Sequence, residues 1–231
     1  MTPATAAPAP RKSWLDKARF GLDLVILLLR MSRLVFKPDD IGPIFRARSV
    51  RNHRSFQLAL ASLKADPGAA QLIAERYLAE KPYDLDVLGQ LPEGTLGREF
   101  ADHMRGHKLE LVFYPPLEDK EDDDITYVRK RARQTHDIHH VVLGLPAVDI
   151  GEMAISAFYL AQNRIPLSAM LLGVGFFVAI FREPERIDEL VEAIIKGWGM
   201  GKRAKIFLGI RWEAYWEMPM PEVRRLLDVP A

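Results

Sequence analysis

The chain has 231 residues, of which 48% are hydrophobic and 27% charged, as in an ordinary globular domain. It contains no cysteine, and this excludes disulfides, thiolate zinc sites and cysteine nucleophiles. The formal net charge is only +1, but the basic side chains outnumber the acidic ones in residues 1–64 and leave the remainder acidic. This basic quarter suits an anionic membrane surface or an acidic partner, although a solvated helix surface has the same composition. We expect no nucleic-acid partner.

The N-terminal arm divides into two predicted parts. Residues 1–12 are rich in alanine and proline and have nothing to bury, which predicts a disordered segment. Residues 13–37 follow as a predicted basic amphipathic helix, for which Ser13 is a suitable N-cap. Apolar side chains recur on this segment at helical spacing, and arginines occupy its polar positions. Such a helix can lie on a membrane or pack on the protein core, and we favour the membrane.

Helical spacing and clear stop signals continue through the first half of the chain. Helices are expected over residues 52–65 and 69–79, each ended by a turn that contains proline. A turn at 91–94 leads into a helix with Leu96, Phe100 and Met104 on one face. Residues 106–124 hold paired prolines and an acidic cluster, which predicts a solvated loop. Its last residue, Asp124, should cap a helix over 125–143, and Gly144-Leu145-Pro146 should end that helix.

The second half also lacks a credible strand. A helix should begin near Asp149, and the uncharged run 165–181 predicts a helix that is buried or faces a greasy cavity. A charged amphipathic helix over 185–196 should stop at a glycine-rich break, 197–201. A last helix should carry Trp212, Tyr215 and Trp216. The sequence therefore predicts an all-α protein, with a single helical domain over 40–231 preceded by the basic arm.

One short segment, His136-Asp137-Ile138-His139-His140, carries the main chemical signal. On a helix, His136 and His140 lie one turn apart on one face, so that two imidazoles can hold one cation. The Asp137 carboxylate can reach the same side, whereas His139 is turned away. The turn at 144–146 folds the chain back and brings Glu152 to the same ion. Two nitrogens and two carboxylates make a complete tetrahedral set of ligands or an incomplete octahedral one.

Other interpretations of these residues stay open. Glu152 lies three residues after Asp149, which is the spacing of a capping box. His136 can be a core histidine bonded to a backbone carbonyl, and Asp137 can pair with Arg133 one turn earlier. Zinc proteases carry a glutamate as general base where this segment has Asp137. The shorter aspartate side chain would hold the carboxylate too far back from the ion for that role. Histidine-aspartate phosphohydrolases need further ligands that the sequence does not place.

The order of several motifs resembles a known family. His136-Asp137-x-x-His140, followed by eleven residues and then Glu152, matches the signature of the ubiquinone (coenzyme Q) biosynthesis proteins numbered four in their pathway's series. The resemblance extends from about residue 40 to the C-terminus. Further stretches that resemble the family are Leu91-Pro92-Glu93-Gly94-Thr95-Leu96-Gly97-Arg98-Glu99-Phe100, Leu143-Gly144-Leu145-Pro146, Gly151-Glu152 and Arg211-Trp212-Glu213.

The resemblance implies a mainly helical metalloprotein on a membrane face, with zinc or iron held by His136, Asp137, His140 and Glu152. It implies association with other ubiquinone-biosynthesis proteins and with a polyprenylated ring intermediate. The expected location is peripheral, on the cytoplasmic face of a bacterial inner membrane or the matrix face of a mitochondrial one. A homo-oligomer is also compatible with the resemblance. The uncharged run can line a cavity for the isoprenoid tail, or it can be plain core; the tail-lining candidates are Leu167, Met170, Leu171 and Val174.

Three functional hypotheses follow. The first is a metal-dependent decarboxylase that oxidatively removes the C1 carboxyl of a polyprenylated hydroxybenzoate and leaves a hydroxyl. The second is a non-catalytic scaffold, whose metal site anchors a lipid head group and presents it to partner enzymes. The third and weakest is a metal-dependent hydrolase. Turnover by the purified protein separates the first two.

Overall fold

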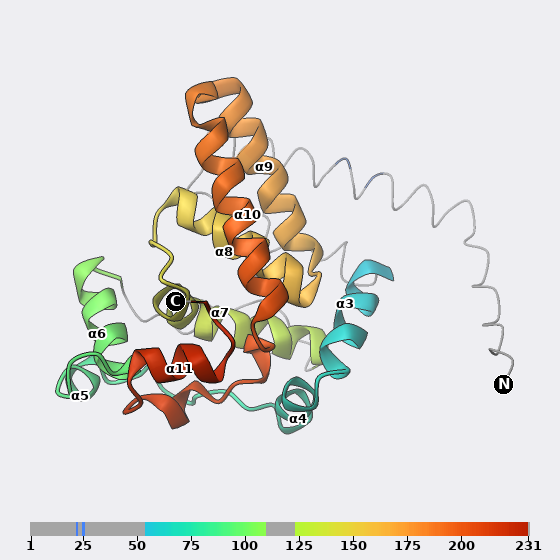
Figure 1. The fold of residues 1–231 in the computed structure, drawn as a ribbon. Helices are drawn as coiled ribbons and strands as arrows, with labels where there is room; N and C mark the ends of the chain where they lie inside the picture. The colour runs from blue at the N-terminus through green and yellow to red at the C-terminus, as the bar shows by residue number, and fades with distance from the viewer. Residues whose placement is uncertain (1–21, 23–24, 26–53, 110–122, 231) are drawn as a thin grey trace, which may run out of the picture. The chain divides into compact units, whose positions relative to one another are not determined.

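A computed structural model describes residues 22, 25, 54–109 and 123–230 (Figure 1). The chain divides into two compact units, Met1–Arg51 and Asn52–Ala231, and nearly all described residues belong to the second unit. The predicted disordered segment 1–12 lies outside the described residues. So does the predicted helix 13–37, except for Leu22 and Val25, which are helical.

The regular secondary structure of the second unit is helical in its described ranges, which confirms the all-α prediction. No β-strand forms there, and a single antiparallel bridge joins Thr95 to Pro219. The α-helices are α3 (Arg54–Lys64), α4 (Pro67–Glu75), α5 (Leu85–Leu88), α6 (Leu96–Gly106), α7 (Asp124–Leu143), α8 (Asp149–Asn163), α9 (Pro166–Arg182), α10 (Ile187–Arg203) and α11 (Met220–Leu226). The short 3-10 turns are η2 (Pro184–Arg186), η3 (Phe207–Gly209) and η4 (Trp212–Tyr215).

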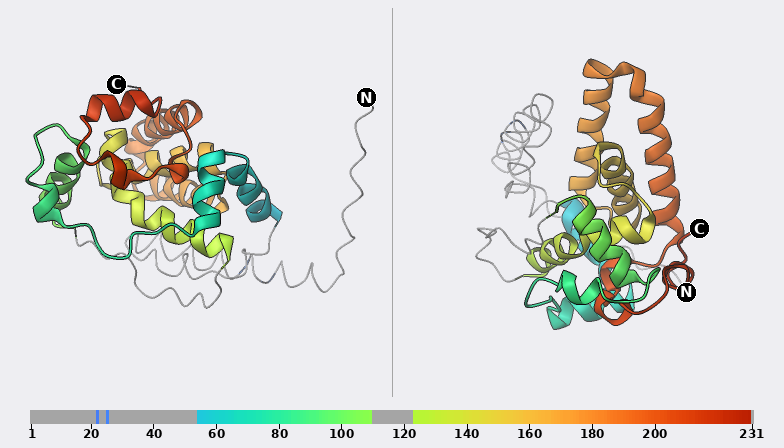
Figure 2. Two further views of the ribbon diagram at one scale, coloured as in Figure 1. Left: turned by 90° about the horizontal axis from the view of Figure 1, so that it is seen from below. Right: turned by 90° about the vertical axis from the view of Figure 1, so that its left-hand side faces the viewer.

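Helix α7 occupies the middle of this unit. Helices α6 and α11 lie toward its C-terminal end, and α3 and α4 lie toward its N-terminal end (Figures 1 and 2). Helix α8 packs against both α9 and α10, which form an antiparallel pair (Figure 2). Phe100, Phe158, Phe207 and Trp212 are fully buried in the main core cluster, where elements distant in the sequence meet.

The start of α7 differs from the prediction by one residue. Asp123, not Asp124, is the N-cap, and its carboxylate accepts a hydrogen bond from the Thr126 amide at 2.9 Å. Asp124 instead forms ion pairs with Lys64 of α3 and with Arg76 just after α4. Two adjacent aspartates are equally suitable caps locally, and the cations supplied by the tertiary structure decide between them.

The predicted glycine-rich break at 197–201 is wrong, because α10 continues through it to Arg203. The reason is close packing: a Cβ atom on Gly197 would lie 1.9 Å from the Ala154 carbonyl oxygen of α8, and one on Gly201 would lie 2.6 Å from that of Phe158. The glycines therefore allow two helix backbones to approach each other, at the modest cost that glycine imposes inside a helix.

This packing predicts opposite effects for two glycines of the same helix. Gly197→Ala should destabilise the protein by about 1–3 kcal/mol, because the added methyl group must displace the backbone of α8. Gly199→Ala is the matched control, since its Cβ would meet only the Arg203 guanidinium, at 3.6 Å. It should stabilise the chain by up to about 1 kcal/mol through helix propensity. Urea unfolding of both variants measures the difference, and equal effects would contradict the close approach.

Helix α9 forms where the uncharged run predicts it, but it is not buried along its length. Only Ser168, Leu172 and Ala179 are buried, while Phe177 is 58% and Phe181 71% exposed. The absence of charge therefore reflects an apolar outer face and not burial on all sides. Among the residues that the structure describes, no helix combines the length and the apolar character that a membrane crossing needs.

The predicted last helix around Trp212 is replaced by the 3-10 turn η4 and the separate helix α11. The carbonyls of Trp216 and Met218 accept hydrogen bonds from the amides of Gly97 and Leu96, at 2.8 and 2.9 Å. These amides stand at the start of α6 and have no partner within their own helix. The segment after η4 is therefore held as an irregular cap for α6, which a continued helix could not provide.

Candidate metal centre

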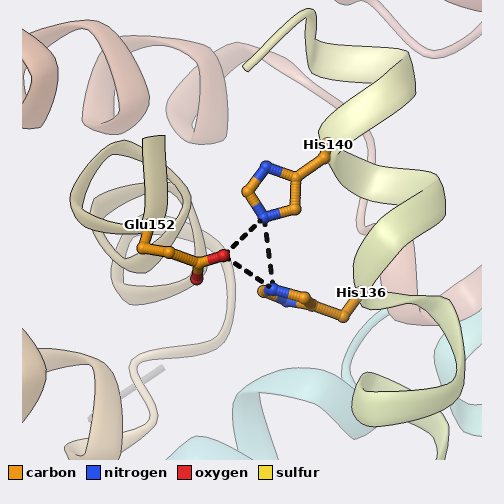
Figure 3. Close-up of side chains that lie close together, drawn as sticks. All are labelled: His136, His140 and Glu152. Carbon is orange, nitrogen blue, oxygen red and sulfur yellow. Dashed lines mark hydrogen bonds and ion pairs between the residues drawn. The ribbon is translucent and has the colours of Figure 1, made fainter. Parts of the chain in front are cut away.

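Three side chains that are predicted ligands converge between α7 and α8 (Figure 3). His136 and His140 project from adjacent turns of α7, and their Nε2 atoms are 3.2 Å apart. Glu152 reaches them from the first turn of α8, with its Oε1 atom 3.4 Å from Nε2 of His136 and 3.1 Å from Nε2 of His140. Each residue thus contributes one ligand atom to a common point.

The turn between the two helices makes this convergence possible. Gly144 ends α7 in the left-handed conformation, with φ of 62°, which glycine adopts without strain. The chain then passes through Pro146 and enters α8. A Cβ atom on Gly151 would lie 1.7 Å from the Pro146 carbonyl oxygen, so that only glycine allows α8 to start so close to the turn. The neighbouring Glu152 is consequently delivered to the histidines.

The donor set fits a cation. His140 Nδ1 lies 3.2 Å from the carbonyl oxygen of Leu145, and a carbonyl can only accept, so the ring proton sits on Nδ1. In the neutral ring, Nε2 then presents a lone pair to the Glu152 carboxylate. Two facing acceptors repel unless a proton or a cation lies between them. Two imidazole nitrogens and one carboxylate oxygen suit zinc or iron and leave coordination positions free.

The electrostatics of the centre favour positive charge beside the Glu152 carboxylate. Burial by itself would raise the pKa of Glu152, but the neighbouring His136 and His140 imidazoles hold that pKa well below its usual range. Burial likewise opposes the charged form of His136, yet Glu152 and Asp137 raise its pKa overall. The His140 side chain is fully buried, whereas those of His136 and Glu152 are 32% and 43% exposed. The centre therefore opens on the side of these two residues.

Asp137 does not join the three converging side chains. It is partly buried, and its negative charge acts on His103, His136 and Tyr159. A ligand role for Asp137 stays a prediction. The capping-box alternative for Glu152 does not describe the structure, because Val148 is the N-cap of α8 and no side chain caps it.

The predicted tail-lining residues also stay untested. All four lie on α9 and are partly buried. An apolar pocket of the described residues lies elsewhere, between α3 and α7, and includes none of the four among its lining residues. Its walls include Phe56, Ala59, Leu63, Ile125, Val128 and Ile165.

Two further residues lie at the centre: Tyr159, which sequence reasoning missed, and His139, which it set aside as turned away. The Tyr159 hydroxyl oxygen lies 2.6 Å from Nδ1 of His139 and 3.3 Å from Nδ1 of His136. Burial raises the pKa of Tyr159 and lowers that of His139 far from their usual values, so both groups are neutral. The available signal was the helical spacing of Tyr159, two turns after Glu152 on α8.

The comparisons with known proteins identify the family of this chain. The family description "Coenzyme Q (ubiquinone) biosynthesis protein Coq4" matches residues 47–231. Human and rat proteins named mitochondrial ubiquinone biosynthesis protein COQ4 homolog are 30% and 31% identical over 78% and 72% of this chain. The matched regions span 67% and 63% of those two proteins. A solved structure from Nostoc punctiforme, whose name also refers to ubiquinone biosynthesis, is 31% identical with a TM-score of 0.78; the match covers 90% of this chain and 97% of that one. The chain therefore belongs to the Coq4 family of coenzyme Q (ubiquinone) biosynthesis proteins.

Proposed function

We propose that this protein is a metal-dependent oxidative decarboxylase of ubiquinone biosynthesis, which replaces the C1 carboxyl of a polyprenylated hydroxybenzoate with a hydroxyl. Membership in the family supports the pathway. The observation that carries the chemistry is the convergence of His136, His140 and Glu152 on one point with an open side. A site that leaves coordination positions free can accept a substrate as well as hold an ion.

The residues of the centre have distinct tasks in this proposal. His140 is fully buried and hydrogen-bonded to the Leu145 carbonyl, so it holds the ion from the inner side of the centre. His136 and Glu152 complete the ligand set on the open side, where the ring carboxylate would enter. A bound zinc or iron ion would supply positive charge to engage that carboxylate and, in the case of iron, a redox centre. Asp137 is retained as a proposed fourth ligand or as a nearby negative charge.

The proposed reaction needs an oxidant. One aryl carboxylic acid, one dioxygen, two electrons and two protons give one phenol, one carbon dioxide and one water. The bond between the ring and the carboxyl carbon breaks, and a bond between the ring and an oxygen atom forms. With this stoichiometry a two-electron reductant accompanies dioxygen, so the assay supplies one.

The scaffold hypothesis is the second candidate, and the exposed apolar face of the α9–α10 pair favours it. Phe177, Phe181, Ile195 and Trp198 are all exposed, and apolar surface of this kind often contacts a membrane or another protein. In this alternative, the centre anchors a lipid head group at a membrane surface but catalyses no reaction on it. Other ubiquinone-biosynthesis proteins would be the partners, and the peripheral locations named above apply to both candidates.

Turnover by the purified chain tests the proposal. The protein, loaded in turn with iron and with zinc, receives dioxygen, a two-electron reductant and a prenylated hydroxybenzoate labelled with ¹³C in its carboxyl group. Labelled carbon dioxide and the ring hydroxylated at C1 should appear in equal amounts. Tight binding of the substrate without labelled carbon dioxide, under both metals, would reject the enzyme and support the scaffold.

A further inference from the structure

A hydrogen-bonded chain of three side chains lies behind the candidate metal centre. The Tyr159 hydroxyl of α8 sits between Nδ1 of His136 and Nδ1 of His139, at 3.3 and 2.6 Å. His136 is a candidate ligand, whereas His139 contributes no atom to the converging set. Tyr159 therefore connects the side of His136 that faces away from the centre to a residue that faces the core.

The two candidate ligand histidines differ in the partner of their Nδ1 atom. His140 faces the Leu145 carbonyl, which can only accept, so that the proton of this ring is held on Nδ1. His136 faces a phenol, which can either accept or donate. A phenol that donated to Nδ1 would leave the ring proton on Nε2, the atom that must bind the ion. Tyr159 alone consequently does not specify the binding tautomer of His136.

We infer that His139 resolves this ambiguity, so that Tyr159 and His139 are positioning residues that hold His136 in its metal-binding tautomer. The 2.6 Å separation directs the Tyr159 hydrogen toward Nδ1 of His139. The phenol oxygen is then left to accept from Nδ1–H of His136, whose Nε2 lone pair faces the centre. The inference rests on the proposed metal site but not on the decarboxylase chemistry.

The surroundings of His139 show how much its ring depends on Tyr159. When Nδ1 accepts, the ring proton lies on Nε2, and this atom is buried with no hydrogen-bond partner among the described residues. The rings of Phe207 and Trp212 pack around the imidazole, with centroids 5.1 and 5.4 Å away. An orphaned buried polar atom is unfavourable and calls for an explanation. Because Nε2 has no partner in either tautomer, the bond between Nδ1 and the Tyr159 hydroxyl is the polar contact that holds this buried ring among the described residues.

The test measures zinc affinity of the full chain by competition with a chromophoric chelator. Tyr159→Phe and His139→Leu should each weaken zinc binding by about 10–100-fold, the range for residues that orient a metal ligand. His139→Asn should restore most of the affinity, because the amide oxygen can stand near the position of Nδ1. Tyr127→Phe is the matched control: it removes another buried phenol, whose hydroxyl donates to the Tyr77 carbonyl at 3.1 Å. Its zinc affinity should equal that of the unchanged chain.

The absorption spectrum of the cobalt-loaded protein gives a second readout. The visible bands report ligand geometry at the ion, so they should change in Tyr159→Phe and His139→Leu but not in Tyr127→Phe. Unchanged zinc affinity and cobalt spectra in both site variants would overturn the inference. So would equal weakening in His139→Leu and His139→Asn, if thermal unfolding shows that both metal-free variants fold.

The outcomes separate this inference from the proposed function. If the chain without substitutions binds neither zinc nor cobalt, both the metal site and the inference are rejected. A chain that binds both ions and shows the expected losses in the variants, but does not turn over substrate, supports the inference and rejects only the decarboxylase.

Discussion

Glu152→Gln should leave the chain folded and weaken its hold on a divalent ion by more than about 100-fold, beyond the effect of changing a residue that only orients a ligand. The substitution preserves the shape of the side chain and one carbonyl oxygen but removes the negative charge. The Glu152 carboxylate lies 3.1 Å from Nε2 of the buried His140. When a neutral amide replaces it, the ligand set no longer neutralises the charge of the ion. Zinc competition and urea unfolding measure the two effects separately.

The same variant should block the C1 step in cells. The test strain lacks its own Coq4 protein and carries the variant instead. In this strain the carboxylated precursor should accumulate relative to the C1-hydroxylated product. Glu222→Gln is the matched control, because Glu222 also stands in the first turn of a helix and is half exposed but is not one of the three converging side chains. A folded Glu152→Gln variant that supports normal quinone levels would reject the catalytic metal site and favour the scaffold.

Arg131→Met should destabilise the protein by about 3–5 kcal/mol, as expected when one partner of a buried ion pair is removed. The Arg131 side chain is fully buried on α7, where it pairs with Glu213 at 3.2 Å and donates to the Ile210 carbonyl at 2.8 Å. It thereby joins α7 to the segment around η4. Methionine fills much of the space but leaves the Glu213 carboxylate without its cation.

The stability lost in Arg131→Met should become smaller as the pH falls. Burial would raise the pKa of Glu213, but the charge and hydrogen bonds of Arg131, together with the Tyr83 hydroxyl and a backbone hydrogen bond, lower it overall. In the unchanged chain, Glu213 therefore contributes stability above its unfolded pKa, and this contribution is lost as the pH falls through the lower folded value. In Arg131→Met, the Tyr83 hydroxyl still opposes burial, but without the cation the folded pKa of Glu213 lies higher than in the unchanged chain. The difference in stability between the two chains should then shrink as the pH falls.

Urea unfolding at neutral and at mildly acidic pH measures this difference. The double variant Arg131→Met with Glu213→Gln is the control, because it removes both charges and should recover part of the lost stability at neutral pH. A double variant as unstable as Arg131→Met alone, with no pH dependence in either, would show that the lost packing of Arg131 matters and its charge does not.

The sequence by itself determined the all-α class and the positions of most long helices, because these depend on apolar spacing and on local caps and stops. The helix that carries the histidines, predicted over 125–143, forms as α7 and ends at Gly144. Spacing alone placed His136 and His140 on one face, and the Gly144–Pro146 turn brought Glu152 back to them. The family signature could be read from the same residues.

Only the tertiary structure decided the features in which distant segments meet. The chain continues as α10 through Gly197 because the backbone of α8 lies against it, and nothing local to the sequence indicates that neighbour. The segment after Trp212 stays irregular because its carbonyls cap α6. His139 was set aside as turned away from the ion, and its contact with Tyr159 depends on how α8 packs beside α7. Local propensity extends over a few residues, whereas these contacts join residues that are 20 or more positions apart, and only the packed chain brings them together.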